Sequence, residues 1–192
     1  KETLASIVAD HLTRISKTLS YAIAQNNNHG ISEAAALFIG GAWLVEHGES
    51  ENQCQLGTHC VETGSYWLED RVETLIFDDG GFSQYSANYH RVLLDSLSQV
   101  EFWRLELNHP VFSDSFYKKA RAAITWLLSI IVIDTGHVAN LGANDGAQLY
   151  SLNERDYDDF RPSLQLLSVL LNGTKLFDDP ACDASLDWLG LN

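Results

Sequence analysis

The sequence predicts an all-α protein built of antiparallel helical hairpins. Apolar residues recur at three- and four-residue spacing in one segment after another, which is the period of an amphipathic helix. Polar or glycine-containing turns separate these segments, and none of the segments shows the alternation of a half-buried strand. This pattern is typical of a helical bundle or of an α/α toroid, and periodicity alone does not distinguish the two.

Three helices are expected in the N-terminal half. Residues 3–24 carry Leu, Ile and Val at helical spacing and run into a cluster of Asn residues that ends the helix. Residues 30–46 form an alanine- and glycine-containing helix, whose small residues allow another helix to come close. The polar residues 47–57 are expected to be a loop. A third helix follows over 58–77, where two Asp and two Gly provide strong turn chemistry.

Three long helices and one short helical piece are expected in the C-terminal half. They cover residues 87–107, 113–133, 157–171 and 184–189. Ser86 is the expected N-cap of the first of these, and His109 followed by Pro110 ends it. A long polar connection, 134–155, joins the second to the third. Connections of this length inside a compact domain are often functional.

Length, charge and composition exclude several classes of protein. A chain of 192 residues is one domain or a piece of a larger protein, and its 45% hydrophobic content excludes disorder. A formal net charge of −14 argues against nucleic acid as a partner, because no basic stripe exists to neutralise phosphates. No apolar run approaches the roughly 20 residues of a membrane span. The absence of Met, even at the first position, indicates a processed or excised segment.

The cysteines and glycines indicate neither a metal nor a cofactor. Cys54, His59 and Cys60 fit no standard zinc spacing. Three Cys provide no disulfide framework, although a bridge between Cys54 and Cys60 stays open. Gly80 and Gly81 lack the spacing of a dinucleotide or phosphate loop. We therefore expect no cofactor and no metal site.

The segment from Gln25 to Glu33 places four side-chain amides and an imidazole at the start of an apolar helix. Such a polar cluster is costly unless its groups are hydrogen-bonded or used. In one interpretation, Asn28 is the N-cap and Glu33 interacts with the positive end of the helix dipole. In the other, Asn28 and His29 project into a cleft and bind an anionic substrate.

A second polar segment leads into the expected helix over 87–107. If Ser86 caps this helix, Tyr89 and His90 lie in its first turn, where the helix dipole stabilises a phenolate. The pKa of a free Tyr is about 10, so a Tyr that acts as a base near neutral pH needs such help. In the alternative interpretation, Tyr89 is a packing residue and His90 a hydrogen-bonded polar neighbour.

The order of these segments resembles that of the heparinase II/III-like superfamily of polysaccharide lyases, which includes related alginate lyases. That family has an Asn-Asn-His before an Ala-rich helix, and an Asp-Gly-aromatic turn that leads to a Tyr-His at the head of a later helix. Both marks are present here in that order. The loop with Asn144 and Asp145 also resembles a third polar loop of the family. The resemblance covers residues 20–170.

The resemblance implies an incomplete α/α toroid with a cleft along one rim that holds acidic polysaccharide. Family lyases cleave by β-elimination: a base removes the proton beside the uronic acid carboxylate, and the glycosidic oxygen leaves from the adjacent carbon. Asn28 and His29 match the pair that offsets the carboxylate charge, and Tyr89 matches the catalytic acid or base. Glu33, one turn beyond His29, would orient the imidazole. Further candidate substrate-binding residues are His90, Arg91, Asn144 and Asp145.

One feature departs from the family. Its enzymes carry a C-terminal β-sandwich domain that supplies a further His or Tyr to the cleft, whereas this sequence has no β-rich region and fewer helices than a complete toroid. We therefore expect residues 1–192 to be a single helical domain from a larger lyase, with little or no activity alone. The resemblance also implies a periplasmic or secreted protein.

Two alternatives stay open. An α/α-toroid glycoside hydrolase needs two carboxylates about 5–10 Å apart, and no spacing selects a pair. The available carboxylates are those of Asp78, Asp79, Asp145, Asp158 and Asp159. A glycan-binding domain without chemistry would keep the cleft and stack aromatic side chains on sugars, although most aromatic residues lie in apolar stripes.

Overall fold

The all-α prediction is confirmed. The structure, a computed structural model, describes residues 3–150, 152 and 155–191. The elements are α1 (Leu4–Ala24), α2 (Asn28–His47), α3 (Glu51–Leu75), α4 (Ala87–Glu106), α5 (Asp114–Ile130), α6 (Arg161–Asn172), the 3-10 helix η1 (Pro180–Cys182) and α7 (Ala184–Leu189). Within the described residues, β pairing is limited to one isolated antiparallel bridge between Ile76 and Phe82.

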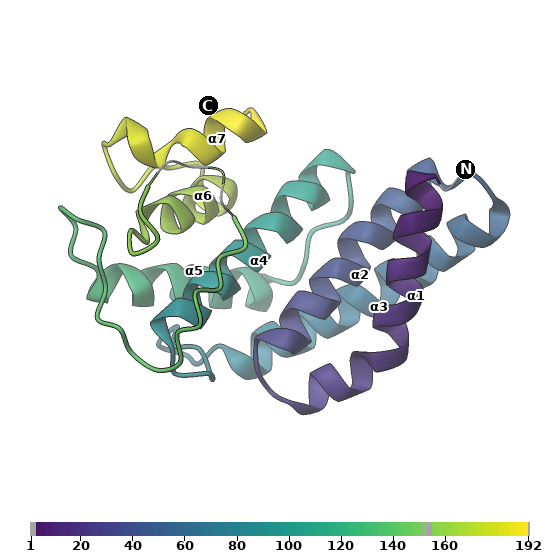
Figure 1. Ribbon diagram of the computed structural model, residues 1–192, viewed down its shortest axis with the longest axis horizontal. Helices are drawn as coiled ribbons and strands as arrows, with labels where there is room; N and C mark the ends of the chain where they lie inside the picture. Colours follow the sequence, from purple (N-terminus) through teal and green to yellow (C-terminus); the bar gives the residue numbers. More distant parts are fainter. Residues whose placement is uncertain (1–2, 151, 153–154, 192) are drawn as a thin grey trace.

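Helices α1, α2 and α3 lie side by side at one end of the molecule, joined by short turns (Figure 1). Glycines allow α2 and α3 to approach closely. A Cβ atom added at Gly57 would lie 2.8 Å from the Gly41 carbonyl oxygen, and one at Gly64 would lie 2.5 Å from the Phe38 nitrogen. The small residues of the second helix therefore provide the close helix contact that the sequence predicts.

Helix α4 lies between this group and the C-terminal helices, and it packs against α2, α5 and α6 (Figure 1). Most of its residues are buried, including polar ones. The larger of two hydrophobic clusters surrounds it, whereas the smaller one fills the space between α1, α2 and α3. Because α4 is central, its first turn is fixed by packing on several sides.

Two helix starts differ by four or more residues from the sequence prediction. Residues 47–57 were expected to be a loop, and this is wrong, because α3 begins at Glu51. Ser50 caps it by accepting a hydrogen bond of 3.3 Å from the Gln53 backbone nitrogen. Helix α6 begins at Arg161, later than the sixth helix was expected to begin, since Pro162 in its first turn favours a helix start. The long connection therefore covers 131–160.

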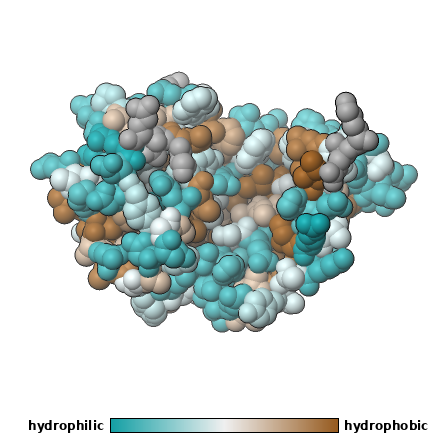
Figure 2. All heavy atoms as spheres, in the orientation of Figure 1, coloured by the Kyte–Doolittle hydropathy of each residue, from teal (hydrophilic) through white to brown (hydrophobic). Residues whose placement is uncertain are grey.

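Hydrophilic residues cover most of one face of the molecule, and hydrophobic residues form separate patches on it (Figure 2). Several large apolar side chains are nevertheless exposed, among them Tyr85 and Trp188. Of the helices in the described part of the chain, none is long and apolar enough to cross a bilayer.

Candidate functional site

The start of α2 is tied to the chain segment that leads into α4. Asn27, rather than Asn28, is the N-cap of α2, and its side-chain oxygen accepts a hydrogen bond of 3.0 Å from the His29 nitrogen. The backbone nitrogen of Asn28 donates to Gln84 Oε1 at 3.1 Å, and Ser83 Oγ donates to the Asn26 carbonyl oxygen. The two motifs that the sequence singled out are therefore held side by side. The prediction that Asn28 caps the helix is wrong by one residue.

His29 lies on the surface, and Glu33 is half-buried one helical turn further along. Burial raises the pKa of Glu33, and the nearby His29 lowers it in part. One carboxylate oxygen of Glu33 is buried without a hydrogen-bond partner. The two side chains therefore interact through charge. Among the described residues, no hydrogen bond joins Asn28 or His29 to Tyr89.

Tyr89 lies in the first turn of α4 and is paired with an acid. Ser86 caps the helix, as predicted, because its Oγ accepts a hydrogen bond of 3.1 Å from the Tyr89 nitrogen and donates to the Ala143 carbonyl oxygen. The Tyr89 hydroxyl donates a hydrogen bond of 2.6 Å to Asp145 Oδ2. This hydrogen bond raises the pKa of Tyr89, burial adds to the increase, and the same bond lowers the pKa of Asp145. The expectation of a phenolate stabilised by the helix dipole is wrong, because a carboxylate faces the hydroxyl.

Asn144 and Arg91 belong to a network that joins the long connection to α4. The Tyr157 hydroxyl lies 2.6 Å from both Asn88 Oδ1 and Asn144 Oδ1. Arg91 donates to Asn88 Oδ1 at 2.8 Å and to the Tyr157 carbonyl oxygen. Its guanidinium lies 4.2 Å from the ring centroid of Tyr157 and 4.3 Å from that of Phe160. Because Arg91 is fully buried, its geometry fits a clamp on the connection better than a substrate-binding role.

His90 is also fully buried, so it is unavailable to a glycan on the surface. Its ring stacks on Trp126 with 4.6 Å between centroids, and Nε2 lies 2.9 Å from the Ala123 carbonyl oxygen. A carbonyl only accepts, so Nε2 carries the proton and Nδ1 is an acceptor, which has no partner. Burial lowers the pKa of His90 to about 4. The prediction of a substrate contact at His90 therefore finds no support in its position.

The sequence interpretation missed Asp95. Its carboxylate is fully buried next to Arg91, and burial raises its pKa to about 6. Buried polar residues recur on α4 at three- and four-residue spacing, namely Asn88, Arg91, Asp95 and Ser98. That spacing is visible in the sequence and indicates a polar face that lies under another segment. The apolar stripe of the same helix does not reveal this polar face.

The carboxylates required by a glycoside hydrolase are mostly engaged. Asp78 pairs with Lys119 at 2.8 Å, Asp158 with His137 at 3.1 Å and Asp159 with Arg161 at 2.7 Å. The Asp145 carboxylate accepts a hydrogen bond from the Tyr89 hydroxyl. These partners leave few free carboxylates for the pair that a glycoside hydrolase needs.

No group of three or more His, Cys, Asp or Glu side chains within the described residues could hold a metal ion. Cys54 and Cys60 are free thiols, which settles the open question of a bridge between them. Both lie on α3, where six residues rise about 9 Å, more than a disulfide spans.

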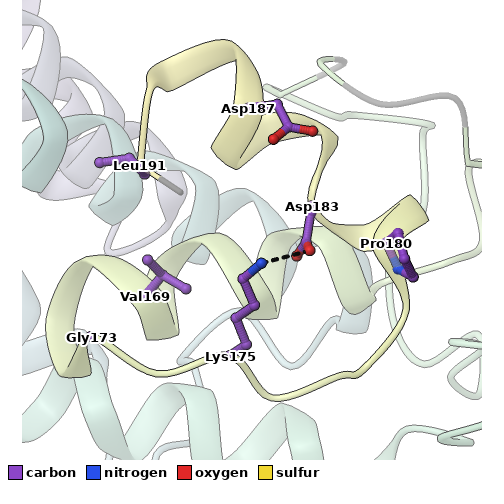
Figure 3. Close-up of a pocket in the computed structure, with 7 residues that line it drawn as sticks. All are labelled: Val169, Gly173, Lys175, Pro180, Asp183, Asp187 and Leu191. Atoms are coloured by element: carbon purple, nitrogen blue, oxygen red, sulfur yellow. Dashed lines mark hydrogen bonds and ion pairs between the residues drawn. The ribbon is translucent and has the colours of Figure 1, made fainter.

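A further pocket of about 430 Å³ lies beside α6 and α7, and the ion pair between Lys175 and Asp183 crosses it (Figure 3). Asp183 also accepts a hydrogen bond of 2.6 Å from Gln165 Nε2. Gln165 is fully buried, and its Oε1 accepts hydrogen bonds from the backbone nitrogens of Leu176 and Phe177. The polar groups of this pocket therefore hold the C-terminal turns together and leave few contacts for a ligand.

The site that the structure assembles thus consists of the start of α2, the segment before α4 and the 131–160 connection. No family model, curated protein or solved structure matches the chain, so the interpretation of this site rests on its own geometry.

Proposed function

We propose that the chain is the helical part of a heparinase II/III-like lyase and binds uronic-acid-containing polysaccharide where the starts of α2 and α4 meet. In this proposal its helical hairpins form part of an α/α toroid. The observation that carries it is the hydrogen bond from the Tyr89 hydroxyl to the Asp145 carboxylate in the first turn of α4. Just before that turn, Gln84 accepts a hydrogen bond from the Asn28 nitrogen at the start of α2. A proton donor and a surface imidazole then lie on neighbouring helix starts.

The start of α2 neutralises the uronate carboxylate. Asn28 and His29 lie in the first turn of α2, and within the described residues no hydrogen bond engages their side chains, so both can donate to an anion. Such donors stabilise the negative charge that develops when the proton beside the carboxylate is removed. Glu33 lies close enough to His29 for their charges to interact.

Tyr89 acts as the acid. Its raised pKa keeps the proton on the phenol at neutral pH. When glycan binds, the hydroxyl exchanges its hydrogen bond to Asp145 for one to the glycosidic oxygen, and the proton passes to that oxygen as the carbon–oxygen bond breaks. The adjacent Asp145 carboxylate disfavours the resulting phenolate, which then takes a proton back from solvent. Arg91 and Asn144 support the connection that carries Asp145. The base that removes the carbon-bound proton comes from the β-sandwich domain of the parent chain.

Under this proposal the isolated chain binds acidic glycan but turns over little or none. The first test is a calorimetric titration of the chain with a uronate oligosaccharide at two salt concentrations. We expect the affinity to fall as the salt concentration rises. We also expect His29→Ala to lower the affinity about tenfold. His11→Ala, on the surface of α1, is the matched control and leaves the affinity unchanged. Equal affinity of both variants would refute a carboxylate site at the start of α2.

The second test uses the parent protein with its following domain. Elimination leaves an unsaturated sugar that absorbs in the ultraviolet, whereas hydrolysis does not. We expect such product from the parent protein and at least a hundredfold loss of turnover in Tyr89→Phe. If glycan binding survives Tyr89→Phe and the parent protein forms no product, the chain is instead a glycan-binding domain without chemistry. The same proposal places the parent protein in the periplasm or outside the cell.

A further inference from the structure

A small cavity with aromatic walls lies next to the start of α4. It has a volume of about 100 Å³ and is lined in part by Phe77, Tyr85 and Trp126. The rings of Phe77 and Tyr85 lie 5.9 Å apart between centroids. The cavity runs from Tyr85, which is 75% exposed, to the fully buried His90. Since a water molecule occupies about 30 Å³ of liquid, the space suits a ligand of a few heavy atoms.

Tyr85 is held in this position at a conformational cost. Its φ is +51°, which is uncommon for an aromatic residue. Its backbone nitrogen donates to the Phe82 carbonyl oxygen at 3.0 Å, and Gly142 packs against its carbonyl oxygen so closely that an added Cβ would lie 2.1 Å away. Backbone strain of this kind clusters at ligand sites.

The carboxylate of Asp79 gives the cavity a negative charge. Asp79 lines the cavity, whereas its neighbour Asp78 forms an ion pair with Lys119. Within the described residues, Asp79 has no ion pair, and one of its oxygens accepts a hydrogen bond from the Gly81 nitrogen. Aromatic faces and a carboxylate together favour a cation.

We propose that the cavity between Phe77, Tyr85 and Trp126 binds a small alkylammonium cation. The rings of Tyr85 and Trp126 attract the charge, and the Asp79 carboxylate neutralises it. The net charge of −14 raises the local concentration of cations. A neutral alcohol of the same shape lacks the charge and binds more weakly. The cavity adjoins the candidate glycan site, because the segment before α4 lines both, but cation binding in it does not require glycan binding or lyase chemistry.

The test follows the indole N–H signal of Trp126 by NMR while ethylammonium chloride is added, with sodium chloride keeping the ionic strength constant. Trp126→Phe assigns the signal. We expect a saturable shift with a dissociation constant in the millimolar range, because the ligand has few atoms. Ethanol, the neutral isostere, should give no saturable shift. If ethanol shifts the signal as much as ethylammonium, or if neither saturates, the proposal is overturned.

Two surface variants locate the site without disturbing the core. Asp79→Asn keeps the hydrogen bond to the Gly81 nitrogen, and Tyr85→Ala removes an exposed ring. Each should weaken ethylammonium binding about three- to tenfold. The matched controls are Asp10→Asn and Tyr66→Ala, which alter exposed groups elsewhere and should leave it unchanged. Unchanged binding in Asp79→Asn, with circular dichroism like that of the parent chain, would rule out the charge recognition.

Discussion

The hydroxyl of Tyr89 donates a hydrogen bond of 2.6 Å to the carboxylate of Asp145, across 56 residues of sequence. This contact connects the first turn of α4 to the long connection. It also decides the protonation of the phenol, because a carboxylate partner favours the neutral form. The Tyr89 hydroxyl therefore keeps its proton and donates it in the hydrogen bond to Asp145.

Asp145→Asn should lower the pKa of Tyr89, because the acceptor loses its charge. A ¹³C NMR titration of the labelled tyrosine ring would measure this, with Tyr89→Phe identifying the signal. Asp10→Asn, on the surface of α1, is the control and should leave the titration of Tyr89 unchanged. An unchanged Tyr89 pKa in Asp145→Asn would show that the two side chains do not interact in solution.

His90 and Asp95 should give opposite pH dependences of stability. The pKa of His90 is lowered to about 4 in the folded state, so the unfolded chain binds its proton first, and stability falls as the pH drops from about 6.5 to 4. The pKa of Asp95 is raised to about 6, so the folded chain binds its proton first, and stability falls as the pH rises from about 4 to 6. Each contribution is about 3 kcal/mol at most, so the two largely cancel.

Asp95→Asn should therefore reveal the His90 dependence. We expect the free energy of unfolding of this variant to rise steadily between pH 4 and 6.5, whereas that of the parent chain changes less. Urea unfolding at four pH values in this interval would measure both. If the two profiles are parallel, Asp95 does not titrate in the folded state as the structure implies.

Arg91→Lys should destabilise the chain although it keeps the charge. Lysine cannot reproduce the fork that binds both Asn88 and the Tyr157 carbonyl oxygen, nor lie flat between the rings of Tyr157 and Phe160. We expect a loss of about 2–4 kcal/mol in the free energy of unfolding. Arg14→Lys on the exposed face of α1 is the control and should change it by less than about 0.5 kcal/mol. Similar losses in both variants would contradict the clamp.

Two glycines of the N-terminal helices should respond in opposite ways to alanine. At Gly64 the new Cβ meets the backbone nitrogen of Phe38 at 2.5 Å, so the helices must separate, at a cost of about 1–3 kcal/mol. At Gly40 it meets only the flexible end of Leu12 at 2.9 Å, and alanine gains about 1 kcal/mol in helix propensity. Thermal unfolding would compare the two. Equal melting temperatures would mean that α2 and α3 are less closely packed than described.

Thiol labelling should distinguish the three cysteines. Cys54 is partly exposed, whereas Cys60 and Cys182 are buried, and burial raises the pKa of Cys182 to about 11. Because the thiolate is the reactive form, a disulfide reagent should modify one thiol rapidly in the folded chain and three after denaturation. Rapid labelling of Cys182 in the folded chain would show that η1 opens readily.

Much of the fold follows from local sequence patterns. The apolar periodicity predicted helices near 3–24, 30–46, 87–107 and 113–133, because an amphipathic stripe needs only neighbouring residues to be recognised. The Ser86 cap was also predictable from local sequence, because Ser is a preferred residue directly before a helix. The start of α3 at Glu51 was missed because its first turns are polar, so no stripe marks them.

For the candidate site, the sequence by itself determined which residues stand at the two helix starts and that the segments carrying them are polar. Only the tertiary structure decided that Gln84 contacts Asn28, that Asp145 meets Tyr89, and that His90 and Arg91 are buried. Residues far apart in sequence make these contacts. The pKa values and accessibility of a site depend on burial and on neighbouring charges, and packing of the whole chain sets both.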